Sequence, residues 1–194
     1  MRYIISIWPA EHQRKALAMV KITFDKLISV YPISVLEGKN GMRVSFRRTG
    51  PSFAPDSPSV SFFDKTAKEK LTANVVKVYH PDKSSCHEFV WNDDSLSCKV
   101  FPCEMQPDNL VGTAVMDICH LLRISGIRLF CFASGKRMVL FPERTVRKDG
   151  EWEFESITKI HDDAREMFIS KLWQEYDKVN RRIEHDRNYR NEKR

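Results

Sequence analysis

The chain has no apolar stretch long enough to cross a membrane as a helix. Its opening, MRYIISIWP, is too short an apolar run for the hydrophobic region of a signal peptide followed by a cleavage site. We therefore expect a cytoplasmic protein with no membrane partner. Its five cysteines are odd in number and mostly lie in strand-like runs, so we expect reduced thiols instead of a disulfide framework.

The chain also lacks motifs for catalysis. There is no Gly-rich phosphate-binding loop and no Gly-x-Ser-x-Gly nucleophile turn. Cys119 and His120 are neighbours, and neighbours in a strand point to opposite faces, so they make a poor nucleophile–base pair. Asp162-Asp163 and the pair Glu151 and Glu155 are more typical of helix-start and loop charges than of an acid–base pair. We expect neither an enzyme nor a cofactor.

The spacing of cysteine and histidine argues against a zinc site. Cys98 and Cys103 are separated by four residues, at the edge of the spacing that structural zinc sites use, and no second tight pair follows. Cys86-His87 and Cys119-His120 lie in the same region without completing such a pattern. Cysteines in apolar strands are usually small buried hydrophobes. We therefore expect no metal.

The composition is that of a globular protein with a modest excess of positive charge. With 194 residues, 42% hydrophobic and 11% aromatic, the chain can form one ordinary domain or two small ones. The formal net charge of +6 favours polyanionic partners, although it is diluted over the length of the chain.

Two similar hairpin sequences lie in the two halves of the chain. VLEGKNGMRVSFRR (35–48) and LFCFASGKRMVLFPER (129–144) each place a Gly-containing turn between two apolar runs. The match extends over 27–46 and 121–141 with one inserted residue, and over 67–79 and 164–176 without a gap. Several matches in the same order predict a tandem duplication.

The duplication settles the secondary structure before each hairpin. Residues 10–28 have apolar positions at helical spacing, but those from 20 to 24 alternate as in a strand. Pro32 aligns with Gly126, and a helix through both positions is disfavoured. We therefore expect bent or bulged strands over Ala16–Leu36 and Val111–Phe132, with a helix over 10–28 as the alternative.

Two helices follow the strands. Asp64 can cap a helix over 65–79, and a long charged helix is expected from Ser156 to the end, with an apolar stripe that includes Phe168, Leu172 and Tyr176. The predicted fold class is α+β: two tandem copies of a small antiparallel β-sheet with a C-terminal helix packed on it, and an internal pseudo-dimer as one arrangement. The units are expected at 1–81 and 96–177, joined by a linker at 82–95 and followed by a basic helical extension or tail at 178–194.

Each copy keeps part of a recognisable pattern. The first has Phe24-Asp25 before an aliphatic strand and the turn Glu37-Gly38-Lys39-Asn40-Gly41. The second has Phe141-Pro142, a basic segment with Asp149-Gly150, and a helix with Tyr176 near its end. These features resemble the SpoVG family of septation and gene-expression regulators, small bacterial proteins of about the length of one repeat. The first copy departs from the family at 47–59, which has no Asp-Gly turn, and the second lacks the acidic residue in its hairpin turn.

The resemblance implies a DNA- or RNA-binding regulator. Single-copy members work as dimers, so this chain is expected as a monomer with an internal pseudo-dimer or as a homodimer. Phosphates require clustered cations. The candidates on the hairpins and in the basic segment, three of which match the family's basic loop, are Arg43, Arg47, Arg48, Lys136, Arg137, Arg144, Arg147 and Lys148. The tail adds Lys178, Arg181, Arg182, Arg187, Arg190, Lys193 and Arg194.

Two further interpretations stay open at this point. Trp152 or Tyr189 can stack on unpaired bases, although a core or surface role is more usual for each. The long C-terminal helix can instead serve a protein partner, with the basic residues as solubility charge. Its apolar positions exceed what one small sheet needs, namely Phe168, Leu172, Trp173, Tyr176 and Val179.

Overall fold

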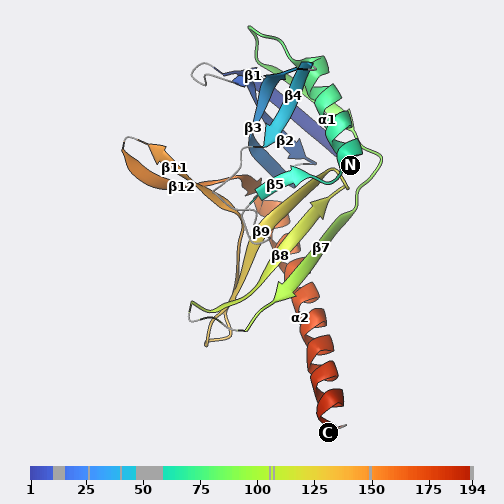
Figure 1. Ribbon diagram of the computed structural model, residues 1–194, viewed down its shortest axis with the longest axis vertical. Helices are drawn as coiled ribbons and strands as arrows, with labels where there is room; N and C mark the ends of the chain where they lie inside the picture. Colours follow the sequence, from blue (N-terminus) through green and yellow to red (C-terminus); the bar gives the residue numbers. More distant parts are fainter. Residues whose placement is uncertain are drawn as a thin grey trace.

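The computed structural model describes residues 1–10, 16–25, 27–39, 41–46, 59–104, 106, 108–148 and 150–192. It is an α+β fold with two antiparallel sheets and two helices, as predicted (Figure 1). Sheet A has the strand order β13-β3-β2-β1-β6, with β4 also paired to β3. Its strands are β1 (Arg2–Pro9), β2 (Ala16–Phe24), β3 (Ile28–Gly38), β4 (Gly41–Phe46), β6 (Ser85–Val90) and β13 (Thr158–Ile160).

Sheet B has the strand order β10-β9-β8-β7, with β5 also paired to β9. Its strands are β5 (Ser59–Phe62), β7 (Leu96–Pro102), β8 (Leu110–Ile118), β9 (Leu122–Cys131) and β10 (Arg137–Leu140). The strands β11 (Glu143–Lys148) and β12 (Glu151–Ser156) form a separate two-stranded ribbon that projects from the body (Figure 1). We call this ribbon the arm.

The predicted duplication is visible in the strand register. The β2–β3 pair has irregularities between Ala16 and Ala18 and between Val20 and Ile22. The β8–β9 pair has the same two irregularities at the aligned positions, between Leu110 and Gly112 and between Ala114 and Met116. The bulged-strand prediction is therefore confirmed, and the helical alternative for 10–28 is wrong, because the alternating residues of β2 point their side chains into the core.

Each half of the chain contributes a strand to the sheet of the other half. β5, from the first half, pairs with β9, and β13, from the second half, pairs with β3. The backbone hydrogen bonds made by the residues just after β5 and β13 are equivalent too. Phe63 N–H donates to Leu121 O at 3.0 Å, and His161 N–H donates to Leu27 O at 2.9 Å. The two units are thus interlocked as an internal pseudo-dimer. The expected helix start at Ser156 is wrong, because β13 takes its backbone partners from β3 before the helix begins.

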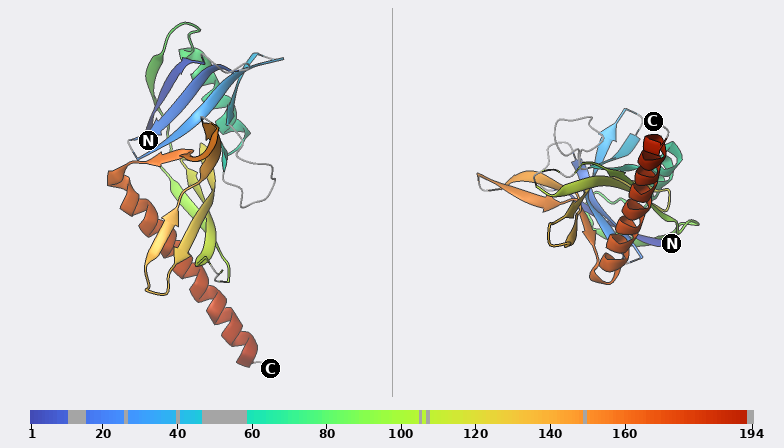
Figure 2. Two further views of the ribbon diagram at one scale, coloured as in Figure 1. Left: turned by 90° about the vertical axis from the view of Figure 1, so that its left-hand side faces the viewer. Right: turned by 90° about the horizontal axis from the view of Figure 1, so that it is seen from below.

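The two helices cover equivalent positions. α1 (Lys65–Val78) buries Ala67, Leu71 and Val75, and the capping prediction is confirmed because Asp64 Oδ1 accepts from Ala67 N–H at 2.7 Å. α2 (Asp162–Glu192) packs along β7 and buries the aligned positions with Ala164, Phe168 and Leu172. Beyond the part that matches α1, α2 runs on past sheet B (Figure 2).

Two segments expected as linker and loop form strands. Within 82–95, β6 pairs with β1 and widens sheet A; the division into units stays a prediction. The basic loop after Pro142 is instead the hairpin arm, closed next to Gly150, whose φ of +92° suits a tight turn. Asp149 lies outside the described residues. Within the described part of the chain, no helix is both long and apolar enough to traverse a membrane.

Candidate nucleic-acid interface

The cations predicted from sequence do not form one patch. Arg43 is exposed on β4 in sheet A, and Lys136 is exposed at the turn between β9 and β10. Arg181 and Arg182 are exposed on the part of α2 that passes sheet B, at the opposite end of the molecule from sheet A (Figure 1). Arg47 and Arg48 lie outside the described residues.

Arg137 is already engaged within the chain. Its guanidinium donates to both carboxylate oxygens of Asp177, at 2.8 and 2.9 Å, and lies 4.6 Å from the centre of the Trp173 ring. The hydrogen bonds to Asp177 raise the pKa of Arg137. These contacts fasten β10 to α2, so Arg137 has a structural task at this position.

The arm is less basic than the resemblance implies. In the register of β11 with β12, Arg144 is opposite Glu155, Arg147 is opposite Trp152, and Lys148 is opposite Glu151. Between residues 143 and 156 the chain has three cations and five carboxylates. Cross-strand pairs of opposite charge stabilise a ribbon, and the excess of carboxylates makes the net charge of this segment negative.

A more favourable surface lies on sheet B, on the face turned away from α2. Burial alternates along β7, where Val100 is buried between the exposed Lys99 and Phe101. On the other face, Cys98 Sγ lies 3.7 Å from Lys171 O in α2. The strand register then places four residues in one row across the sheet: Phe101, Thr113, Arg128 and Leu140. We call this surface, completed by Lys99 and Val115, the open face of sheet B.

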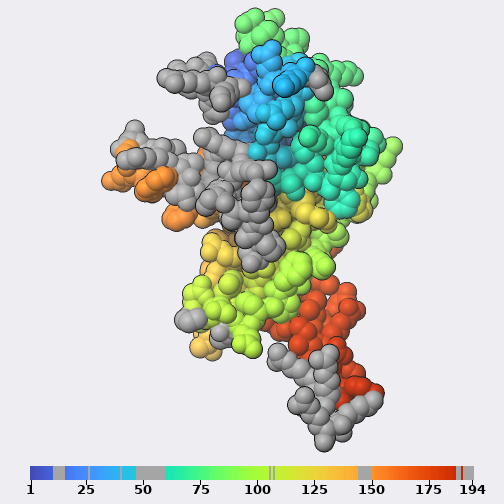
Figure 3. Space-filling view, viewed as in Figure 1, coloured from blue at the N-terminus to red at the C-terminus, as the bar shows by residue number. Residues whose placement is uncertain are grey.

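The open face combines exposed aromatic surface with cations. Phe101 is 45% exposed, and Lys99 Nζ lies 5.2 Å from the centre of its ring. Arg128 is exposed, and its guanidinium carbon lies 5.9 Å from the Phe130 ring. Figure 3 shows the surface of β7 to β9 between the arm and the end of α2.

Negative charge on this face is neutralised. In the described strands of sheet B, Asp117 is the one carboxylate on the open face. Arg123 holds it through two hydrogen bonds of 2.7 and 2.9 Å, and this pairing raises the pKa of Arg123. Lys99 and Arg128 therefore give the face its net positive charge.

The duplication supplies an internal comparison. The register places Trp8 of sheet A where sheet B has Phe101, and both rings are partly exposed. Sheet A has Ser6 at the position of Lys99, and Ser34 at the position of Arg128. The two halves thus share an outward aromatic residue but place the cations differently, since sheet A has Lys21 at the position of Val115 and Arg43 at the position of Met138. Sequence reasoning missed Lys99 and Arg128 because they lie in different strands; the available signal was a cation two residues before a Phe in each strand.

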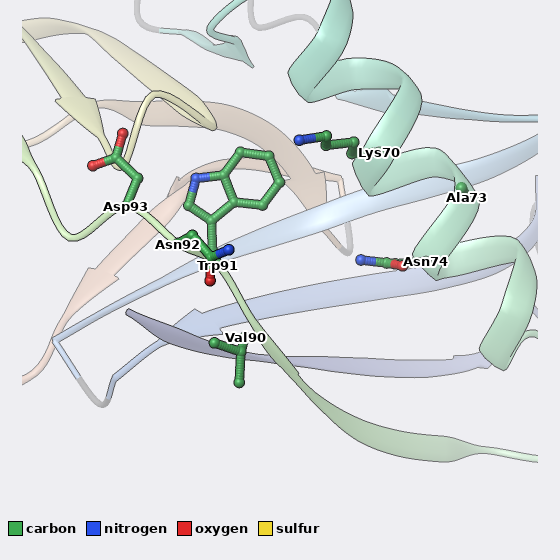
Figure 4. A pocket seen from close by; sticks show the side chains of 7 residues that line it. All are labelled: Lys70, Ala73, Asn74, Val90, Trp91, Asn92 and Asp93. Atoms are coloured by element: carbon green, nitrogen blue, oxygen red, sulfur yellow. The ribbon is translucent and has the colours of Figure 1, made fainter.

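A cavity of about 490 Å³ between α1 and the segment after β6 is the other concave candidate (Figure 4). Trp91 forms one wall, with Lys70 Nζ 4.8 Å from its ring and its indole N–H donating to Cys119 O at 2.7 Å. Asn74 Nδ2 donates to the hydroxyl oxygen of Tyr3 at 2.6 Å. The polar groups of Lys70, Asn74 and Trp91 are thus already engaged within the chain.

The polar cluster beside that cavity does not have the geometry of a proton relay. Asp93 Oδ2 lies 2.6 Å and Ser95 Oγ 3.0 Å from the same ring nitrogen of His120, Nδ1, whereas a relay needs both nitrogens. Hydrogen bonds from Ser95, and then His120, lower the pKa of Asp93 to about 2.

The strand assumed for Cys119 and His120 is also wrong. Both residues have positive φ, 52° and 45°, and lie in the three-residue turn between β8 and β9. Burial of the cysteines is mixed: Cys119 is buried, whereas Cys86 and Cys103 are exposed, so the expectation of small buried hydrophobes fails for the last two.

A search of family models, of curated proteins and of solved structures finds no match to this chain.

Proposed function

We propose that this protein binds DNA or RNA without chemistry, and that the open face of sheet B is its contact surface. The observation that supports the proposal best is the open face itself, where the exposed ring of Phe101 lies on the same side of the sheet as Lys99 and Arg128. Bases stack on aromatic side chains, and cations beside them neutralise phosphates. The SpoVG-like sequence features support the same class of partner and extend the proposal to a cytoplasmic gene-expression regulator.

The end of α2 adds positive charge to the same molecule. From Lys178 to Glu192, where α2 ends, the chain has five cations and three carboxylates. Arg181 and Arg182 are exposed there, and Arg181 Nε donates to the backbone oxygen of Asp177 at 3.2 Å. A helix with this charge strengthens attraction of a polyanion and raises the rate of encounter.

The test is a titration of labelled DNA and RNA oligomers by fluorescence anisotropy across a salt series. Lys99→Ser and Arg128→Ser are combined, which places on sheet B the residues that sheet A has. We expect weaker binding to every sequence, and a salt slope shallower by about 1.5, since each lost phosphate contact removes about 0.7 to 0.9.

The matched control is Lys65→Ser with Lys68→Ser on α1, which changes the net charge equally. Both lysines are exposed and belong to α1, so they are not part of the open face. If the control weakens binding as much as the sheet B variant, the open face is not the contact surface. If the natural protein binds no oligomer at low salt, the proposed function is wrong.

The cluster that matches the family's basic loop is tested in the same assay. Changing Arg144, Arg147 and Lys148 together to Ala is expected to weaken binding across all sequences, because phosphate contacts are independent of sequence. Unchanged affinity would confine the phosphate contacts to the open face and α2.

The alternative is a protein-interaction module built on the C-terminal helix. Three of the apolar residues that suggested it, Phe168, Leu172 and Trp173, are buried within the chain. The uncommitted apolar surface beyond sheet B is smaller, with Ile183 37% exposed. A protein partner would become the leading interpretation if the oligomer titrations fail.

A further inference from the structure

The arm exposes two aromatic rings on one side. Trp152 is 70% exposed and Phe154 is 77% exposed, the two largest values among the exposed aromatic residues described. They are two positions apart in β12, so their side chains point to the same face, about 6.8 Å apart along the strand. Rings exposed to this degree on a narrow ribbon require an explanation.

The carboxylates of β12 lie on the face of the arm opposite the rings. Glu151, Glu153 and Glu155 alternate with the rings along β12 and therefore belong to the opposite face. The register partners of the rings are Arg147, opposite Trp152, and Thr145, opposite Phe154. Those three glutamates therefore lie on the side away from the rings.

The arm follows the open face of sheet B directly in the chain. The row across sheet B ends at Leu140 in β10, and β11 begins three residues later at Glu143.

A second copy of the chain is a poorer binding partner for these rings. An aromatic side chain buries about 150 to 250 Å². Four rings in a symmetric contact would bury about 600 to 1,000 Å², which is short of the roughly 1,200 Å² of a stable interface. Base stacking needs no such area, because each ring covers one base. In a duplex the neighbouring base pairs already cover the base faces, so exposed rings suit unpaired bases.

We propose that the arm binds single-stranded nucleic acid, with Trp152 and Phe154 stacking on unpaired bases. This inference rests on the proposed function and specifies its substrate: single strands, DNA or RNA, in preference to duplex.

The experiment compares an unstructured thymidine oligomer of about 20 nucleotides with a duplex of the same length. The oligomer is longer than the stretch of single strand that one small binding domain covers. Anisotropy titrations use the natural chain, Trp152→Ala, Phe154→Ala and Trp152→Phe. Each Ala variant is expected to lose at least about fivefold in affinity for the single strand, the lower end of the effect of removing one stacked ring. Duplex affinity is expected to stay unchanged, and Trp152→Phe to bind nearly as the natural chain does, because a ring remains.

Glu153→Gln, on the opposite face of the same strand, is the matched control and should not weaken binding. Thermal unfolding of each variant checks that the fold is intact. If the natural chain binds the single strand and the Ala variants bind it equally well, the inference is wrong and the proposed function stands. An equal loss on single strand and duplex also overturns it. If the natural chain binds neither oligomer, the proposed function fails and the inference fails with it.

Discussion

The strand exchange makes a direct prediction about cooperativity: a change in β13 should destabilise both sheets. The perturbation is Ile160→Ala. Ile160 belongs to the second half of the chain, is 8% exposed, and pairs with Ile28 in sheet A.

The magnitude follows from the atoms removed. The substitution deletes three carbon groups, each worth about 0.8 kcal/mol when buried, or about 2.4 kcal/mol in total. A cavity adds to this cost, but β13 lies beside solvent-exposed residues and can relax. We therefore expect the free energy of unfolding to fall by about 2 to 3 kcal/mol, within the usual range for Ile→Ala.

The assay is hydrogen exchange followed by mass spectrometry of peptides. The slowest amides of β2 report on sheet A, and those of β8 report on sheet B. If the interlocked sheets unfold together, both peptides lose protection by the same 2 to 3 kcal/mol. Lys159→Ala, exposed in the same strand, is the control and should stay within about 0.5 kcal/mol of the natural chain.

A loss of protection confined to β2 and β3 would refute this reasoning, because it would show that sheet A opens without sheet B. The reciprocal variant is Phe62→Ala, in β5 and opposite Leu122 of sheet B. It should also lower the protection of the β2 and β8 amides against exchange.

Three further predictions concern single side chains. Arg137→Ala should lower the free energy of unfolding in urea by about 1 kcal/mol, because it removes an exposed ion pair with Asp177 and a cation–π contact with Trp173. Arg137→Lys should not recover the full stability, since an ammonium cannot bind both carboxylate oxygens of Asp177 in the same way. The pKa of Asp93 is about 2 in the folded chain, below the ordinary 3.9, so its contribution to stability is present above about pH 4 and lost toward pH 2; an acid titration of Asp93→Asn should lack that part of the loss. Burial, and then the charge of Asp93, raises the pKa of Cys119 to about 12, so a thiol reagent at neutral pH should label the exposed Cys86 and reach Cys119 only after unfolding.

The duplication and most strands could be predicted because they depend on local patterns. The alignment of Pro32 with Gly126 excluded a helix through both positions, and β3 and β9 are irregular there in the same way. β13 could not be predicted in this way. It has three residues, Thr158–Ile160, and its strand conformation depends on backbone partners in β3, far away in the sequence.

The candidate site shows the same limit. Clusters of cations in the hairpins and the tail were easy to find in the sequence. In the fold these clusters lie in separate places, so they do not form one surface. Lys99 and Arg128 are isolated in the sequence, and the register of β7, β8 and β9, which includes two irregularities, brings them to one face. A shift of one residue in that register would turn Arg128 toward the core.

The most direct test of the central claim is ultraviolet cross-linking of the natural chain to a thymidine oligomer, with the linked residues mapped by mass spectrometry. Binding through the open face and the arm predicts adducts on Phe101 in β7 and on Trp152 in β12. Adducts confined to sheet A and α1, or none at an oligomer concentration that saturates the anisotropy signal, would contradict the account.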